Sequence, residues 1–233
     1  MSIRESFYKE EIRDLAIADI ALIIGFSSVM VWSSGFPNGT SAAGTLSTFL
    51  YFVPISALVV TLNFILHELM HKFVAMKYGA IAAFKASIQG IILTIASGLM
   101  GFLLGITGAT MIYTNRFTRK ENGIVSIAGP ATNIAVFIVF FALLRFGGLA
   151  QGSYMETAAT TALFVSLMLA FFNMLPIFPL DGSKVLAWNV PLYVVLMAAL
   201  LLGIVFILGV SLLDLVFVIG FAYVLSFLSR RMF

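Results

Sequence analysis

The sequence LVVTLNFILHELMHK, residues 58–72, decides how the rest of the chain is interpreted. Its first nine residues carry no charge, and it then contains an H-E-x-x-H pattern. Residues i and i+4 share one face of an α-helix, so His67 and His71 can both reach one metal ion. Glu68 is rotated by about 100° from His67, so its carboxylate can reach a water on that metal. The pattern predicts a zinc peptidase site on a membrane-spanning helix.

The position of these residues supports a functional interpretation. The chain contains two histidines, and both lie in the pattern. An ionisable group at the depth of the bilayer costs about 3 kcal/mol, so such groups usually have a function. The alternative is a polar cluster whose hydrogen bonds hold neighbouring helices together.

Composition identifies the broad class of protein. The 233 residues are 61% hydrophobic and 10% charged, with a mean hydropathy of +1.11. Soluble domains carry about 25% charged residues, so this chain is predicted to be an integral membrane protein. We expect a single membrane domain over residues 1–233, with a catalytic core at about 48–185 and two further spans in 186–233. The net charge of +3 does not suggest nucleic acid, and the absence of cysteine restricts metal ligands to nitrogen and oxygen.

Hydrophobic runs predict an all-α polytopic fold with about six transmembrane helices. Residues 1–14 are expected to form a short interfacial helix or a frayed tail. Residues 86–114 are uncharged and rich in glycine, and they are predicted to be a re-entrant or β-like segment between spans two and three. The six spans are expected at about 15–32, 48–75, 124–144, 157–175, 192–209 and 212–228.

Basic residues favour one topology. If 86–114 enters the membrane and returns, 12 of the 13 lysines and arginines lie on the side of the N-terminus, and only Arg145 lies opposite. If that segment crosses the membrane, seven lysines and arginines lie on the side of the N-terminus and six lie opposite. The positive-inside rule therefore predicts a multi-pass cell-membrane protein with cytoplasmic N- and C-termini.

A catalytic zinc site normally has three protein ligands and a water. The candidates for the third ligand are the acidic residues at membrane depth, Asp19, Asp181 and Asp214. Spans two and four end on the same side in the predicted topology, which favours Asp181, because it follows span four at the depth of the histidines. An ordinary turn after a helix is the alternative for Asp181-Gly182.

Three motifs together resemble one family. The chain contains H-E-x-x-H, then Ala128-Gly129-Pro130-Ala131-Thr132-Asn133, then N-x-x-P-x-x-P-x-D-G from Asn173 to Gly182. In this order they resemble the site-2 protease family of intramembrane zinc metalloproteases, over about residues 48–185. The resemblance implies that His67, His71 and Asp181 bind Zn²⁺ and that Glu68 is the general base. It also implies that Asn173 helps to hold the substrate or its oxyanion, and Asn133 is a second substrate-binding candidate.

The function expected from the sequence is hydrolysis of a peptide bond in or near a transmembrane segment of a membrane-protein substrate. The partners are then that substrate and the lipid bilayer, and the oligomeric state stays open. The alternative is a membrane metal transporter that uses the same His, Glu and Asp side chains. A third possibility is an inactive scaffold that binds transmembrane helices.

Overall fold

A computed structural model describes residues 9–35, 41–113, 117–211, 213–217, 219–220 and 223. The chain divides into two compact units, residues 1–113 and residues 114–233. Most of the expected N-terminal segment 1–14 and much of the expected last span lie outside the described residues. So do both chain termini, and with them the predicted cytoplasmic position of each.

Four helical runs in the described part of the chain are long and apolar enough to cross a membrane. They coincide with the first four predicted spans. The first three runs extend the prediction by a few residues at both ends, and the fourth begins three residues earlier and ends two residues earlier than predicted. The fifth predicted span is a shorter apolar helix of 17 residues, and the count of six spans stays a prediction. The four runs are Lys9–Ser33, Ala42–Lys77, Arg119–Phe146 and Tyr154–Asn173.

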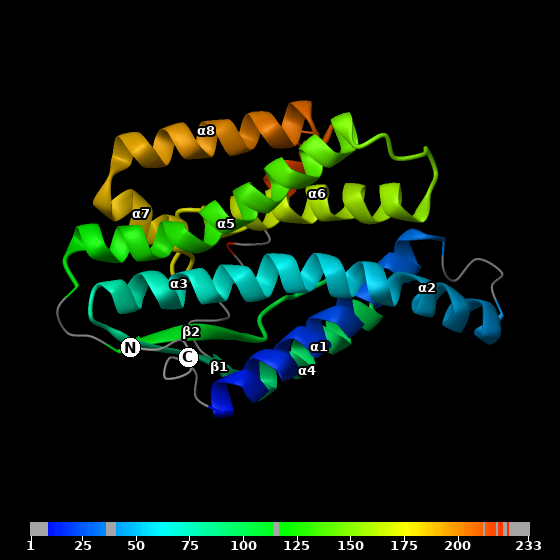
Figure 1. Ribbon diagram of the computed structural model, residues 1–233, viewed down its shortest axis with the longest axis horizontal. Coiled ribbons are helices and arrows are strands. Elements are labelled where there is room, and N and C mark those ends of the chain that lie inside the picture. Colours follow the sequence, from blue (N-terminus) through cyan, green and yellow to red (C-terminus); the bar gives the residue numbers. More distant parts are fainter. Residues whose placement is uncertain are drawn as a thin grey trace. The chain divides into compact units, whose positions relative to one another are not determined.

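The first unit contains the H-E-x-x-H motif, which lies on helix α3 (Figure 1). Helix α1 spans Lys9–Ser33. The second run is continuous but changes its hydrogen-bond pattern, from α2 (Ala42–Val60) through a π-helical segment (Thr61–Ile65) to α3 (Leu66–Lys77). Ser41 begins this run, because its hydroxyl accepts a hydrogen bond from the backbone N–H of Gly44.

The segment predicted to be re-entrant or β-like forms a strand, a helix and a second strand. These are β1 (Ile81–Ala86), α4 (Ile88–Leu99) and β2 (Gly108–Tyr113). The two strands pair antiparallel, with Ile81 opposite Tyr113 and Ala86 opposite Gly108. The β-like alternative is therefore confirmed in part: β2 lies in the segment, but α4 separates the two strands, and β1 begins at Ile81, before the charge-free stretch. The predicted segment began at residue 86 because it was defined by the absence of charge. This start is too late, since Lys85 is a charged residue within β1.

Helix α1 closes the free edge of β1. The backbone N–H of Phe84 donates to Glu11 Oε1 at 3.0 Å, and that of Ala86 donates to Asp14 Oδ2 at 3.2 Å. Glu11 also pairs with Lys72 of α3, and both side chains are buried. One buried carboxylate thus ties α1, α3 and β1 together.

Breaking this buried pair is expected to destabilise the protein. Glu11→Gln should lower the free energy of unfolding by about 3–5 kcal/mol, because the ammonium of Lys72 stays buried without its counter-charge. Thermal unfolding in detergent would measure the loss. Arg13→Ala is the matched control, since the Arg13–Asp14 pair is solvent-accessible on the arginine side and should contribute at most about 1 kcal/mol. Equal melting temperatures for wild type and Glu11→Gln would contradict this role.

Helix α4 lies against α1 at a close crossing (Figure 1). A Cβ added to Gly98 would lie 2.5 Å from the backbone of Gly25, so the absence of side chains at both positions allows the approach. The indole N–H of Trp32 donates to the carbonyl of Leu99 at 3.0 Å and fixes the end of α4.

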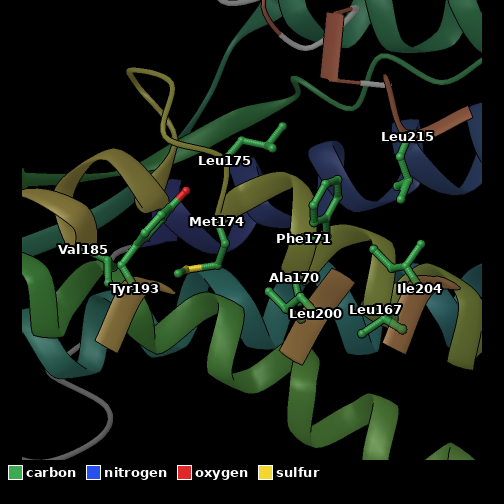
Figure 2. Packing of buried hydrophobic residues seen from close by; sticks show 10 residues of the cluster. All are labelled: Leu167, Ala170, Phe171, Met174, Leu175, Val185, Tyr193, Leu200, Ile204 and Leu215. Carbon is green, nitrogen blue, oxygen red and sulfur yellow. The ribbon is translucent and has the colours of Figure 1, made fainter. Parts of the chain in front are cut away.

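The second unit contains four described helices with assigned bounds: α5 (Arg119–Phe146), α6 (Tyr154–Asn173), α7 (Asp181–Trp188) and α8 (Val190–Phe206). Thr118 and Glu121 form a capping box that begins α5. Figure 2 shows the core of this unit, in which Phe171 and Met174 at the end of α6 lie in one cluster with Leu200 and Ile204 of α8. This packing fixes the chain between α6 and α7, where the N-x-x-P-x-x-P-x-D-G motif lies.

Candidate metal centre

The side chains of His67 and His71 leave the same face of α3 and bring their ring nitrogens together. Their Nε2 atoms are 3.0 Å apart, and both residues are buried, at 7% and 8% exposure. Two imidazole ligands on a tetrahedral zinc, each at about 2.0–2.1 Å, would have nitrogen atoms about 3.3 Å apart. The observed spacing therefore fits one metal ion held by both rings, as the i, i+4 spacing predicted.

Glu68 faces a different direction and is held by the sheet. The backbone N–H of Thr110 in β2 donates to Glu68 Oε2 at 2.8 Å, and the Thr110 hydroxyl lies 2.7 Å from the same oxygen. Among the described residues, the hydrogen bonds to this carboxylate all fall on Oε2. Oε1 is then the oxygen that can accept a proton from water.

Asp181 is the first residue of α7 in the second unit. It is 8% exposed, and Lys184 Nζ lies 3.7 Å from its Oδ1. Gly182 follows it because a Cβ there would lie 2.0 Å from the carbonyl oxygen of Met174. The Asp-Gly pair is thus part of a tight junction between α6 and α7, and this junction holds a carboxylate in a mostly buried position.

The loop before Asp181 is non-helical, as its two prolines predicted. Residues 174–180 form turns and bends, and the Phe178–Pro179 peptide bond is cis. Pro176 and Pro179 have no backbone N–H, so helix α6 cannot continue through them. The loop is held by its own turns, since the N–H of Ile177 donates to the carbonyl of Leu175 and that of Leu180 to the carbonyl of Ile177, each at 2.8 Å.

The two asparagines are placed differently. Asn173, the last residue of α6, is half-buried, and its side-chain amide donates to the carbonyl of Leu169 at 3.0 Å. Its side-chain oxygen is left to accept a hydrogen bond or to turn toward a substrate. Asn133 is fully buried within α5. Their roles in binding substrate stay predictions.

The two other acidic candidates have separate partners. Asp19 accepts a hydrogen bond from the Thr61 hydroxyl at 2.8 Å. Asp214 is exposed and accepts from the Ser211 hydroxyl at 2.7 Å. Asp181 thus remains the favoured third ligand, and His67, His71 and Asp181 together provide a donor set that fits Zn²⁺.

Two contributors to this centre were missed at the level of sequence. Thr110 lies in the segment that no motif matched, and nothing in its neighbours signals a contact with Glu68. Lys72, which directly follows His71, was counted with the cytoplasmic lysines although it is buried. Its neighbours Glu68 and His71 gave no signal that its partner is Glu11, 61 positions earlier.

Comparison with known proteins agrees with this chemistry. No protein-family model matches the chain. "Putative zinc metalloprotease MJ0611" of Methanocaldococcus jannaschii is 40% identical over 184 residues, which cover 78% of this chain and 86% of the relative. "Putative zinc metalloprotease YwhC" of Bacillus subtilis is 36% identical over 171 residues, or 63% of this chain and 75% of the relative. With four apolar helical runs and a His-His-Asp donor set for Zn²⁺, this membrane protein belongs to the zinc metalloprotease family of these relatives.

Proposed function

We propose that the chain is an intramembrane zinc metalloprotease of the site-2 type, which cuts a peptide bond in or near a transmembrane segment of its substrate. The observation that carries this proposal is the pair of Nε2 atoms 3.0 Å apart, with Glu68 beside them, inside one helical run of 36 apolar-rich residues. Ionisable residues within an apolar run of this length are costly, so their presence there supports a site at membrane depth and not the site of a soluble metalloprotease.

The proposed reaction uses Glu68 as the general base. Bound zinc would supply a Lewis acid that acidifies water and polarises the substrate carbonyl. Glu68 removes a proton from the water as it attacks the carbonyl carbon. The same carboxyl then gives that proton to the amide nitrogen as the C–N bond breaks. His67, His71 and Asp181 would hold the metal.

In this proposal the two units form one protease domain. The ligands proposed for its zinc ion are His67 and His71 on α3 and Asp181 at the start of α7. The proposed membrane topology is multi-pass with both termini in the cytoplasm, as the distribution of basic residues suggests. Cleavage is then expected near the cytoplasmic end of the substrate span.

The substrate is proposed to bind as an added strand. A peptide bond inside a helix has its carbonyl in an i to i−4 hydrogen bond, so a transmembrane substrate must unwind before it is cut. The outer edge of β2 supports this mode, because Thr110 on that edge contacts the proposed base directly. Asn173 would contact the substrate or its oxyanion, and Asn133 is a second candidate.

The proposal predicts zinc-dependent proteolysis by the purified protein. The probe is a synthetic span of about 20 leucines and alanines, broken by a Gly-Pro pair near one end so that it unwinds there. We expect one zinc per chain and cuts near the Gly-Pro pair in detergent, both lost on chelation and both restored by Zn²⁺. Mass spectrometry would locate the cut. Purified protein that holds zinc but leaves this span and unfolded casein intact would overturn the proposal.

The transporter alternative predicts a different result with the same protein. Zinc flux into proteoliposomes that survives Glu68→Gln would favour transport. A transport path should also place polar groups through the full thickness of the membrane. The candidate groups of the first unit instead gather around one turn of α3, which favours the protease.

A further inference from the structure

The sheet has two edges, and their backbone N–H groups can be assigned. Phe84 and Ala86 donate to α1, so their N–H groups point away from β2. Thr110 lies directly opposite Phe84. Directly opposed residues of an antiparallel pair either exchange both hydrogen bonds or neither, so the N–H of Thr110 also points away from the sheet. Its acceptor there is Glu68 Oε2.

Thr110 therefore gives two donors to one carboxylate oxygen. Its hydroxyl lies 2.7 Å from Glu68 Oε2 and 3.1 Å from the carbonyl oxygen of Glu68. A hydroxyl has one hydrogen, and the shorter contact to a charged oxygen is the stronger bond. Both residues are half-buried, which limits competition from water. The carboxylate has a fixed direction, with Oε1 open.

We infer that Thr110 is the positioning residue for the general base. Its hydroxyl holds Oε2 so that Oε1 stays in place to take the proton from water. The backbone N–H alone cannot do this during turnover, because an added substrate strand on this edge competes for the same donor. The hydroxyl is then the remaining bond to Oε2. This inference rests on the proposed function.

The test is turnover of the leucine–alanine span by variants of Thr110. Thr110→Val has the same shape and suits a strand, but it lacks the hydroxyl. Loss of a hydrogen bond to a charged group predicts a kcat lower by about ten- to a hundredfold, with KM within about twofold and zinc content unchanged. Thr110→Ser should regain most of the lost kcat because it restores the hydroxyl.

Thr107→Val is the matched control. The Thr107 hydroxyl is buried three residues away and has no hydrogen-bond partner among the described residues. We expect wild-type kcat from this variant. If Thr110→Val does not fold, Thr110→Ser and Thr110→Ala still differ only by the hydroxyl, and serine should be the faster by a similar factor.

Equal kcat for the serine and alanine variants would overturn the inference, as would wild-type kcat for Thr110→Val. A change confined to KM would also overturn it, because that would make Thr110 a substrate contact. Failure of the proposed function is a separate result, since wild type itself would then leave the span uncut. If wild type cuts the span and the Thr110 variants cut it with the same kcat, the inference about Thr110 fails and the proposed function stands.

Discussion

Glu68→Gln should abolish proteolysis while the protein keeps its zinc. Glutamine cannot accept the proton from the attacking water, and general-base catalysis contributes about 10²–10⁴-fold to a rate. The side-chain oxygen of glutamine can still accept the two hydrogen bonds from Thr110, so the geometry around α3 should persist. Cleavage of the leucine–alanine span and zinc content, measured on the same sample, check this result.

Glu10→Gln provides the control for loss of a carboxylate. Glu10 lies on an exposed part of α1, outside the candidate metal centre. Its variant should cut the span at the wild-type rate and hold the same zinc. Proteolysis by Glu68→Gln at the wild-type rate would show that Glu68 is not the base, whatever the metal content.

Asp181→Ala should remove the metal. A zinc ion left with two imidazoles lacks the third protein ligand that catalytic sites require. Loss of a residue that only orients a ligand costs about 10–100-fold in metal affinity, so loss of a ligand should cost more. We expect zinc to fall from one per chain to a small fraction after dialysis, and cleavage to fall with it. Elemental analysis of the purified protein measures this directly.

Asp214→Ala is the control for this prediction. Asp214 is the exposed candidate, and its partner is Ser211. Its variant should keep full zinc and full activity. If Asp181→Ala retained stoichiometric zinc while His67→Ala lost it, the third ligand would have to be another residue. The histidine part of the centre would still stand.

The sequence was sufficient for the histidine pair and for the four long apolar helical runs. The i, i+4 spacing fixes two ring nitrogens on one face of a helix, and long apolar runs have few alternatives to a span. It was insufficient for the sheet. In residues 81–113 the apolar pattern suits a strand or a buried helix equally, and Lys85 hid the start of β1. Contacts such as Thr110 with Glu68 join positions 42 residues apart, and no local pattern encodes them.

Asp181 illustrates an intermediate case. Its depth could be argued from span order, and its buried position at the start of α7 agrees with a ligand role. Its meeting with the histidines depends on how two separate units pack, which neither motif determines. That meeting stays a prediction, and the zinc content of Asp181→Ala tests it.

The π-helical segment at Thr61–Ile65 sets which way the imidazoles face. A π turn holds one more residue than an α turn, so it acts as a one-residue insertion in an otherwise regular helix. Deleting one residue from this segment would let the helix run as α throughout. The His67–His71 spacing would survive, and both rings would keep nearly their present direction relative to α2, because the π turn already absorbs the extra residue. A change of the intact segment from π to α hydrogen bonding, with no change of sequence, would instead turn both rings by about 100° relative to α2.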